Sequence, residues 1–182
     1  IYVDLPFNCI DLGAFSNVSE VVEDGSTFAE NAAKKASGYA LQVGKWVLAE
    51  DSGLVVPILK GDPGIHSARY AGEHGCDAAN NSKLLHELSK YPAENRDAYY
   101  ICVACLADPQ GKVMVLTEGR CHGRIIPEYL GEGGFGYDPL FLVLEYHQTF
   151  GELSSRVKHA ISHRSKALAK LRPSLWQLLS NS

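Results

Sequence analysis

The sequence predicts a mixed α/β fold in a single domain, and three observations support this prediction. The 182 residues can bury the core of one domain, and their 46% hydrophobic and 21% charged content is ordinary for a globular protein. Apolar residues recur at helical spacing after Thr27. Two strand candidates flank the turn signal Asp108-Pro109-Gln110-Gly111, which predicts a long antiparallel hairpin.

The first half of the chain is predicted to contain one long helix and one short strand. Residues 1–26 mix apolar stretches with Asp, Asn and Gly, which indicates short strands and loops. Thr27 and Glu30 have the spacing of a capping box, which satisfies exposed backbone N–H groups at a helix start. The helix is expected to end at Gly44, and residues 45–50 then predict a short buried strand. The apolar stripe of the helix consists of Phe28, Ala32, Ala36, Tyr39, Ala40 and Val43.

The second half is predicted to contain two further helices and three strands. Asp77 is expected to cap a helix that carries Leu84, Leu85 and Leu88. Residues 98–107 and 112–125 are the two strands of the hairpin, and residues 140–143 form one more short strand. The tail is helical from Ser162, and Pro173 should kink this helix or start a new one. One side of the tail helix carries Leu168, Leu171, Leu175, Leu178 and Leu179.

Charge, hydropathy and cysteine usage restrict the partners and the compartment. A net charge of −4 argues against a basic nucleic-acid surface, and no apolar run is long enough to span a bilayer. We therefore expect no nucleic-acid and no membrane partner. The five cysteines are odd in number and scattered, which favours reduced thiols and a cytoplasmic location. Cys102 and Cys105 lie on a predicted strand with opposite orientations, so we interpret them as core residues rather than a zinc or redox pair.

Two acidic pairs are candidate metal sites. Glu50 and Asp51 lie at the carboxyl end of the predicted strand 45–50 and precede a small-residue turn, and ligands collect beyond the carboxyl ends of strands in α/β proteins. Carboxylates in this position can hold Mg²⁺, but they can equally be solvated loop charges. Glu23 and Asp24 precede the capped helix, where they are either a second metal site or favourable partners of the helix dipole.

Two further segments could bind an aromatic, phosphorylated ligand. The glycine-rich segment 131–139 matches a dinucleotide fingerprint, but no clear strand precedes it and no helix opens after it, so we reject a Rossmann site. Its Phe135 and Tyr137 could still stack on a base. Residues 158–164 bring Lys158, His163 and Arg164 to a predicted helix start, where they either bind phosphate and a base edge or form a solvated basic turn.

Five segments together resemble the inosine triphosphate pyrophosphatase family: TFAENAAKKA, LAEDSGL, PGIHSARYAG, GGFGYDPLF and AISHR. They occur in the family's order, and the resemblance extends from Glu23 to the last helix. It implies Mg²⁺-dependent hydrolysis of deaminated purine nucleoside triphosphates (ITP, dITP and XTP) to the monophosphate and pyrophosphate. It also implies an elongated mixed β-sheet with flanking helices, two lobes around a central cleft, and a homodimer.

The resemblance implies a role for each site residue. Asp51 would be the catalytic carboxylate, and Glu23, Asp51 and Glu50 would form the metal site. Lys35 and Lys158 would face phosphates, and Ser52 would contact the substrate near the metal. The base pocket would comprise Phe135, Gly136, Tyr137 and Asp138, with His163 and Arg164 at the base edge. Since arginine only donates hydrogen bonds, it suits the acceptor oxygen at position 6 of hypoxanthine and opposes the amino group of adenine.

Two departures from the family pattern leave an alternative open. The family begins with a strand and helix that carry a Thr-Gly-Asn-x-x-Lys motif, and this sequence lacks that motif. The motif contacts phosphate, so the alternative expectation is a nucleotide-binding protein with impaired catalysis. Glu50 stands where many members have Asp, which is expected to change the geometry only slightly. An unrelated metal phosphohydrolase is a weaker alternative, because it explains the acidic residues but not Phe135 or Ser162-His163-Arg164.

Overall fold

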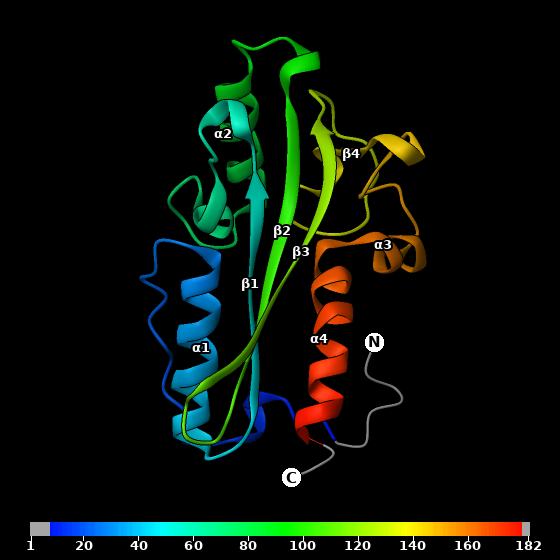
Figure 1. The fold of residues 1–182 in the computed structure, drawn as a ribbon. Helices are drawn as coiled ribbons and strands as arrows, with labels where there is room; N and C mark the ends of the chain where they lie inside the picture. Colours follow the sequence, from blue (N-terminus) through cyan, green and yellow to red (C-terminus); the bar gives the residue numbers. More distant parts are fainter. Residues whose placement is uncertain (1–7, 180–182) are drawn as a thin grey trace. The chain divides into compact units, whose positions relative to one another are not determined.

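The computed structural model of the chain describes residues 8–179 and confirms the mixed α/β fold class (Figure 1). Its sheet has five strands in the order β1-β2-β3-β4-β5. The strands are β1 (Val47–Val55), β2 (Asp97–Ala107), β3 (Val113–Ile125), β4 (Phe141–Val143) and β5 (Gln148–Thr149). The helices are α1 (Phe28–Val43), α2 (Asp77–Leu88), α3 (Ser155–Ile161) and α4 (His163–Leu179). Among the described residues, no helix is long and apolar enough to cross a membrane.

The chain packs into two compact units. Unit 1 contains the described residues up to Asp51, then Cys102–Gly119, and then those from Arg164 onward. Unit 2 contains Ser52–Ile101 and Arg120–His163. Strands β1, β2 and β3 each contribute residues to both units. The expected single domain therefore stays a prediction, and each unit is described below by itself.

Helix α1 begins and ends where the sequence predicts. The Thr27 Oγ1 atom accepts a hydrogen bond from the Glu30 backbone N–H at 3.1 Å. The Glu30 carboxylate reaches back to the backbone N–H of Ser26, one residue earlier than an ideal capping box requires. At the other end, Gly44 adopts a left-handed conformation with a φ of 61°, which glycine allows without steric cost. The predicted stripe supplies the buried residues Ala32, Ala36 and Ala40.

Strand β1 is longer than predicted. The sequence suggested a strand that stops at Glu50 and turns at Ser52-Gly53, but the strand continues to Val55. The reason is that Leu54 and Val56 are both fully buried in the core of unit 2, and this burial outweighs the local turn preference of Ser-Gly. The chain turns later, at a 3₁₀ helix over Pro57–Leu59. Glu50 and Asp51 therefore lie within a strand and not at its end.

The remaining elements include both confirmed and wrong predictions. Strands β2, β3 and β4 and helix α4 lie where they were expected, whereas β5 and α3 were not predicted. Over residues 8–26 the predicted short strands are wrong, since only a 3₁₀ helix at Leu12–Ala14 forms there; residues 1–7 lie outside the described residues. Asp77 is the first residue of α2, and Cys76 occupies the cap position. Pro173 lies inside α4 and starts no new helix.

Each unit has its own apolar core. In unit 1, helices α1 and α4 cover opposite faces of the strands (Figure 1). The apolar core between the strands and α4 consists of Cys102, Ala104, Leu106, Ala167, Leu168, Leu171 and Leu175. The core of unit 2 includes Leu54, Leu84, Leu88, Tyr100, Ile125, Phe141 and Phe150. The expectation that Cys102 and Cys105 are core cysteines is confirmed, because both are buried and free.

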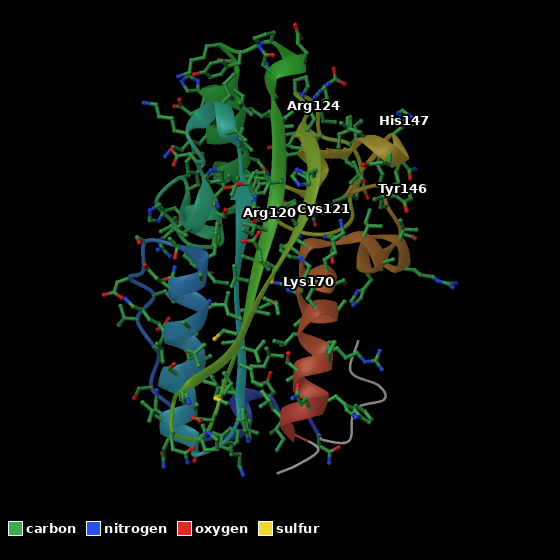
Figure 2. The ribbon with its side chains drawn as sticks, in the orientation of Figure 1. Arg120, Cys121, Arg124, Tyr146, His147 and Lys170 are labelled. Carbon is green, nitrogen blue, oxygen red and sulfur yellow. The ribbon has the colours of Figure 1, made fainter. Side chains whose placement is uncertain are left out.

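Buried and more exposed side chains alternate over residues 119–125 of β3, as expected for a strand with one covered face. Cys121 is buried, whereas Arg120 is exposed and Arg124 is partly exposed on the other side of the strand (Figure 2). Arg124 pairs with Asp97 of β2 at 2.8 Å. In unit 1, Lys170 of α4 donates a hydrogen bond to the backbone oxygen of Glu118 at 2.7 Å (Figure 2). Polar contacts of this kind hold α4 against the middle of β3.

Candidate active site

Unit 1 contains a group of two carboxylates that share one lysine. The Lys35 Nζ atom lies 2.8 Å from Glu23 Oε2 and 3.4 Å from Asp51 Oδ1. Lys35 is on α1, Glu23 is on the loop that precedes this helix, and Asp51 is on β1. The structure therefore brings together three of the residues to which the sequence analysis assigned metal and phosphate roles.

Asn31 belongs to the same group, and the sequence analysis missed it. Its Nδ2 atom donates to Asp51 Oδ2 at 3.2 Å, and its Oδ1 atom accepts from the Gly25 backbone N–H at 2.8 Å. Asn31 is 2% exposed although it is polar, because both ends of its amide are hydrogen-bonded. The signal that could have revealed it is its position four residues before Lys35, which places both side chains on one face of α1.

The electrostatic environment makes Asp51 a less acidic carboxyl than usual. Burial is the main cause that raises its pKa, and the neighbouring Glu23 carboxylate also raises it. Lys35 and the hydrogen bond from Asn31 act in the opposite direction without cancelling the effect. A carboxylate with a raised pKa can accept a proton from water, and it gains when a further positive charge binds beside it.

The donors of this group suit a magnesium ion. Glu23 and Asp51 provide hard oxygen ligands, and the described residues include no group of three or more His, Cys, Asp or Glu side chains around a common point. Mg²⁺ is commonly held by one or two carboxylates together with water and substrate phosphates. The residues present therefore fit this ion better than a metal that needs a full set of protein ligands.

Glu50 does not join this group. Its Oε1 atom lies 2.5 Å from the Nε atom of Arg164, and its Oε2 atom accepts a hydrogen bond from the Cys102 thiol at 3.4 Å. Adjacent residues of a strand point to opposite faces, so Glu50 and Asp51 diverge within β1. The structure thus places one predicted metal carboxylate against a predicted base-reading arginine.

Unit 2 contains the glycine-rich segment, which is organised around Asp138. This carboxylate is 2% exposed, accepts a hydrogen bond from the Phe135 backbone N–H at 2.8 Å, and forms an ion pair with Lys158. Gly134 has a φ of 79°, and a Cβ atom there would lie 2.0 Å from Asp138 Oδ2. Glycine is therefore required at this position for the loop to close around the carboxylate.

The same loop is held against α2 by two residues, Asp77 and Asn81, to which the sequence analysis gave no role at the site. The Gly136 N–H donates to Asp77 Oδ2 at 2.6 Å, and the Gly136 carbonyl accepts from Asn81 Nδ2 at 2.9 Å. No local pattern indicates these contacts, because they join positions more than 50 residues apart.

The aromatic residues of the segment differ in exposure. Phe135 is 66% exposed, and the Lys158 ammonium lies 4.8 Å from its ring centre. Tyr137 is buried, and its hydroxyl donates to the Ser67 carbonyl at 2.8 Å. Of the two aromatic residues proposed to stack on a base, only Phe135 therefore presents its ring to solvent.

His163 lies in a stack of aromatic rings in unit 2. Its ring is 4.9 Å from that of Tyr100 at an interplanar angle of 11°, and Tyr100 in turn stacks on Phe150. His163 is 9% exposed, so packing fixes the orientation of its imidazole. Ser52, on the unit 2 part of β1, is partly buried and forms no side-chain hydrogen bond with another described residue.

A mixed α/β fold that groups two carboxylates and a lysine in one unit, and an exposed aromatic ring beside a lysine in the other, is typical of an enzyme that acts on a phosphorylated ligand. The sequence profile of the Ham1 family matches residues 2–174, and the chain belongs to this family. The resemblance inferred from the five sequence segments is thereby confirmed.

Several similar proteins are described as dITP/XTP pyrophosphatases. A dITP/XTP pyrophosphatase from Rhodopirellula baltica is 54% identical over 97% of this chain and 86% of its own length. One from Geobacter sulfurreducens is 51% identical over 95% of this chain and 87% of its own length. Among solved structures, a HAM1 protein from Coxiella burnetii superposes with a TM-score of 0.89 at 39% identity, over 96% of this chain and 88% of that protein.

Proposed function

We propose that this protein hydrolyses dITP, XTP and ITP to the corresponding monophosphates and pyrophosphate. The relatives that match nearly the full chain at about half identity are dITP/XTP pyrophosphatases. The observation within the structure that carries the proposal is the position of Asp51, a partly buried carboxyl that is hydrogen-bonded to Asn31 and paired with Lys35. A positioned carboxylate can accept a proton from the attacking water, and a neighbouring cation can stabilise charge on a phosphate.

The residues of unit 1 carry the proposed chemistry. Asp51 orients the attacking water and accepts its proton, and its raised pKa brings it closer to a working pH. Glu23 and Asp51 would hold Mg²⁺, which when bound neutralises charge on the phosphates. Lys35 is the cation between these two carboxylates, and it would bind a phosphate oxygen when the substrate enters.

The residues of unit 2, with Arg164, carry the proposed recognition. The exposed ring of Phe135 stacks on the purine, and the loop of Gly136, Tyr137 and Asp138 supports that ring. Lys158 contacts Asp138 and Phe135 and would also face phosphate. Ser52 would contact the substrate near the metal, and His163 and Arg164 would bind the base edge. Arg164 donates to the 6-oxo oxygen that distinguishes deaminated purines from adenine.

The proposal extends to assembly and location. The family resemblance implies a homodimer, and size-exclusion chromatography with light scattering would test this by mass. The five free cysteines support a reducing compartment such as the cytoplasm.

The proposed function is tested by measuring pyrophosphate release with Mg²⁺ from dITP, XTP, ITP, dATP and dGTP. We expect rapid release from the first three and slow release from the last two. Asp51→Asn should lower kcat by roughly 10²–10⁴-fold, the usual contribution of a general base. Asp24→Asn is the matched control, since Asp24 pairs with Lys34 outside the site. Equal turnover of dATP and dITP would refute the proposal, and tight dITP binding without release would support the impaired binding protein instead.

A further inference from the structure

Glu50 and Arg164 form an ion pair that the proposed chemistry does not use. They are 114 positions apart in the sequence, and their side chains are 32% and 42% exposed, respectively. The contact joins β1 to the first turn of α4 within unit 1. Because the pair is only partly exposed, solvent screens it less than a pair on an open surface.

Strand geometry separates this pair from the Asp51 group. Trp46 and Leu48 have the same parity as Glu50 along the chain, and both pack on the α4 side with Cys102. Asp51 has the opposite parity and contacts Asn31 and Lys35 of α1. Both Glu50 oxygens already have partners on the α4 side, so this carboxylate is committed to Arg164 and Cys102.

We propose that Glu50 is a positioning residue for base selection, which holds the Arg164 guanidinium so that its terminal N–H groups donate to the 6-oxo oxygen of a deaminated purine. The inference rests on the proposed function and replaces a metal role for Glu50. The hydrogen bond to Glu50 engages Nε, one of the five N–H donors of an arginine. The four donors on the two terminal nitrogens remain in a plane whose orientation Glu50 restrains.

Restraining this plane matters because a free arginine can reorient. An arginine side chain has several rotatable bonds, and a side chain ordered before binding loses less rotamer entropy when the ligand arrives. A restrained guanidinium also cannot rotate away from the amino group of adenine, so two hydrogen-bond donors face each other and adenine binds less well. Glu50 thus contributes both to the binding of the correct base and to the exclusion of the wrong one.

Cys102 restrains Glu50 in turn. The thiol is fully buried and donates to Glu50 Oε2. Burial, reinforced by the Glu50 charge, raises the pKa of the Cys102 thiol well above its ordinary value, so it remains a protonated donor at neutral pH. Cys102, Glu50 and Arg164 therefore form a chain of contacts from the core to an exposed guanidinium.

The test compares base selectivity with metal dependence in wild type, Glu50→Gln and Glu50→Asp. Glutamine keeps the length but removes the charge, whereas aspartate keeps the charge but shortens the reach. We expect both to lower the ratio of kcat/KM for dITP to that for dATP by about tenfold or more, as expected for a lost hydrogen bond to a charged group. The Mg²⁺ concentration for half-maximal activity should stay unchanged. Glu23→Gln is the matched control and should raise that concentration without changing the base ratio.

A double-mutant cycle with Arg164→Met separates positioning from a merely structural role. If Glu50 acts through Arg164, Glu50→Gln should change selectivity little in the Arg164→Met background. Unchanged selectivity in Glu50→Gln and Glu50→Asp, or a raised Mg²⁺ requirement in them, would overturn the positioning role while the proposed function stands. A wild-type enzyme that does not prefer dITP over dATP would overturn the proposed function, and the positioning role with it.

Discussion

At the scale of single residues, Asp51 links activity to stability through its raised pKa. The unfolded value of an Asp is about 3.9. Between that value and the higher folded one, the folded state binds more protons, so stability falls as the pH rises through this interval. Above it, the charged form makes the folded state less stable than a neutral side chain would.

We therefore predict that, without metal, Asp51→Asn raises the melting temperature at pH 7 and that this gain disappears below about pH 4. Thermal unfolding from pH 3 to pH 8 with a chelator present measures the difference. Added Mg²⁺ should stabilise the wild type and leave Asp51→Asn unchanged, because only the wild type keeps both carboxylates. A lower melting temperature of the variant at pH 7 would contradict the raised pKa.

Gly25 affects the Asp51 carboxyl indirectly, through its contact with Asn31. A Cβ atom at Gly25 would lie 2.6 Å from Asn31 Oδ1, closer than atoms tolerate, so Gly25→Ala should displace Asn31 and its hydrogen bond to Asp51. We predict a fall in kcat of about tenfold, in line with a lost hydrogen bond to a charged group. Asn31→Ala should give a similar fall, and the double variant little more, because both act on one contact. Additive losses in the double variant would show two separate effects.

At the scale of elements, helix α1 supplies both Asn31 and Lys35, so its first turn affects the site. Thr27→Ala removes the cap bond to Glu30 and should cost about 1 kcal/mol of stability, or about 2–4 °C in melting temperature. Thr27→Ser keeps a hydroxyl and is the matched control. Calorimetry of the three proteins measures the effect, and equal losses in both variants would show that the methyl group of threonine matters rather than the cap.

The sequence predicts those elements best whose stability is local. Helix α1 has both of its end signals, and the hairpin of β2 and β3 has its turn, where Gly111 N donates to Asp108 O at 2.9 Å. The two-residue β5 and the seven-residue α3 are too short to have a strong period of their own. The full length of β1 depends on burial of Leu54, which is a property of the folded core.

The same distinction applies to the site residues. Chemistry and resemblance single out Asp51, Glu23 and Lys35, and the structure brings these three together. The opposite directions of Glu50 and Asp51 could not be predicted, because the sequence analysis placed the pair at the end of the strand and followed it with a turn, whereas both residues lie within β1. Asp77 and Asn81 contact the glycine-rich loop through folding of distant segments, and no spacing in the sequence records such contacts.

At the scale of the whole molecule, two apolar cores depend on three common strands. Leu171 is fully buried in unit 1, and Leu84 is fully buried in unit 2. Leu171→Ala and Leu84→Ala should each cost about 2–5 kcal/mol. Since β1, β2 and β3 belong to both units, we expect each variant to unfold in one transition and to lose amide protection in both units. Hydrogen exchange measures this directly, and loss confined to one unit would show that the two unfold independently.

The alternation of Glu50 and Asp51 along β1 also limits how this protein can vary over evolutionary time. One residue inserted ahead of this pair would turn Asp51 toward α4 and Glu50 toward α1, so a shift of one residue would reverse the directions of both side chains. Deletions have the same effect, and compensation would need matching changes on both helices. The register of β1 therefore constrains the number of residues between Lys35 and Asp51.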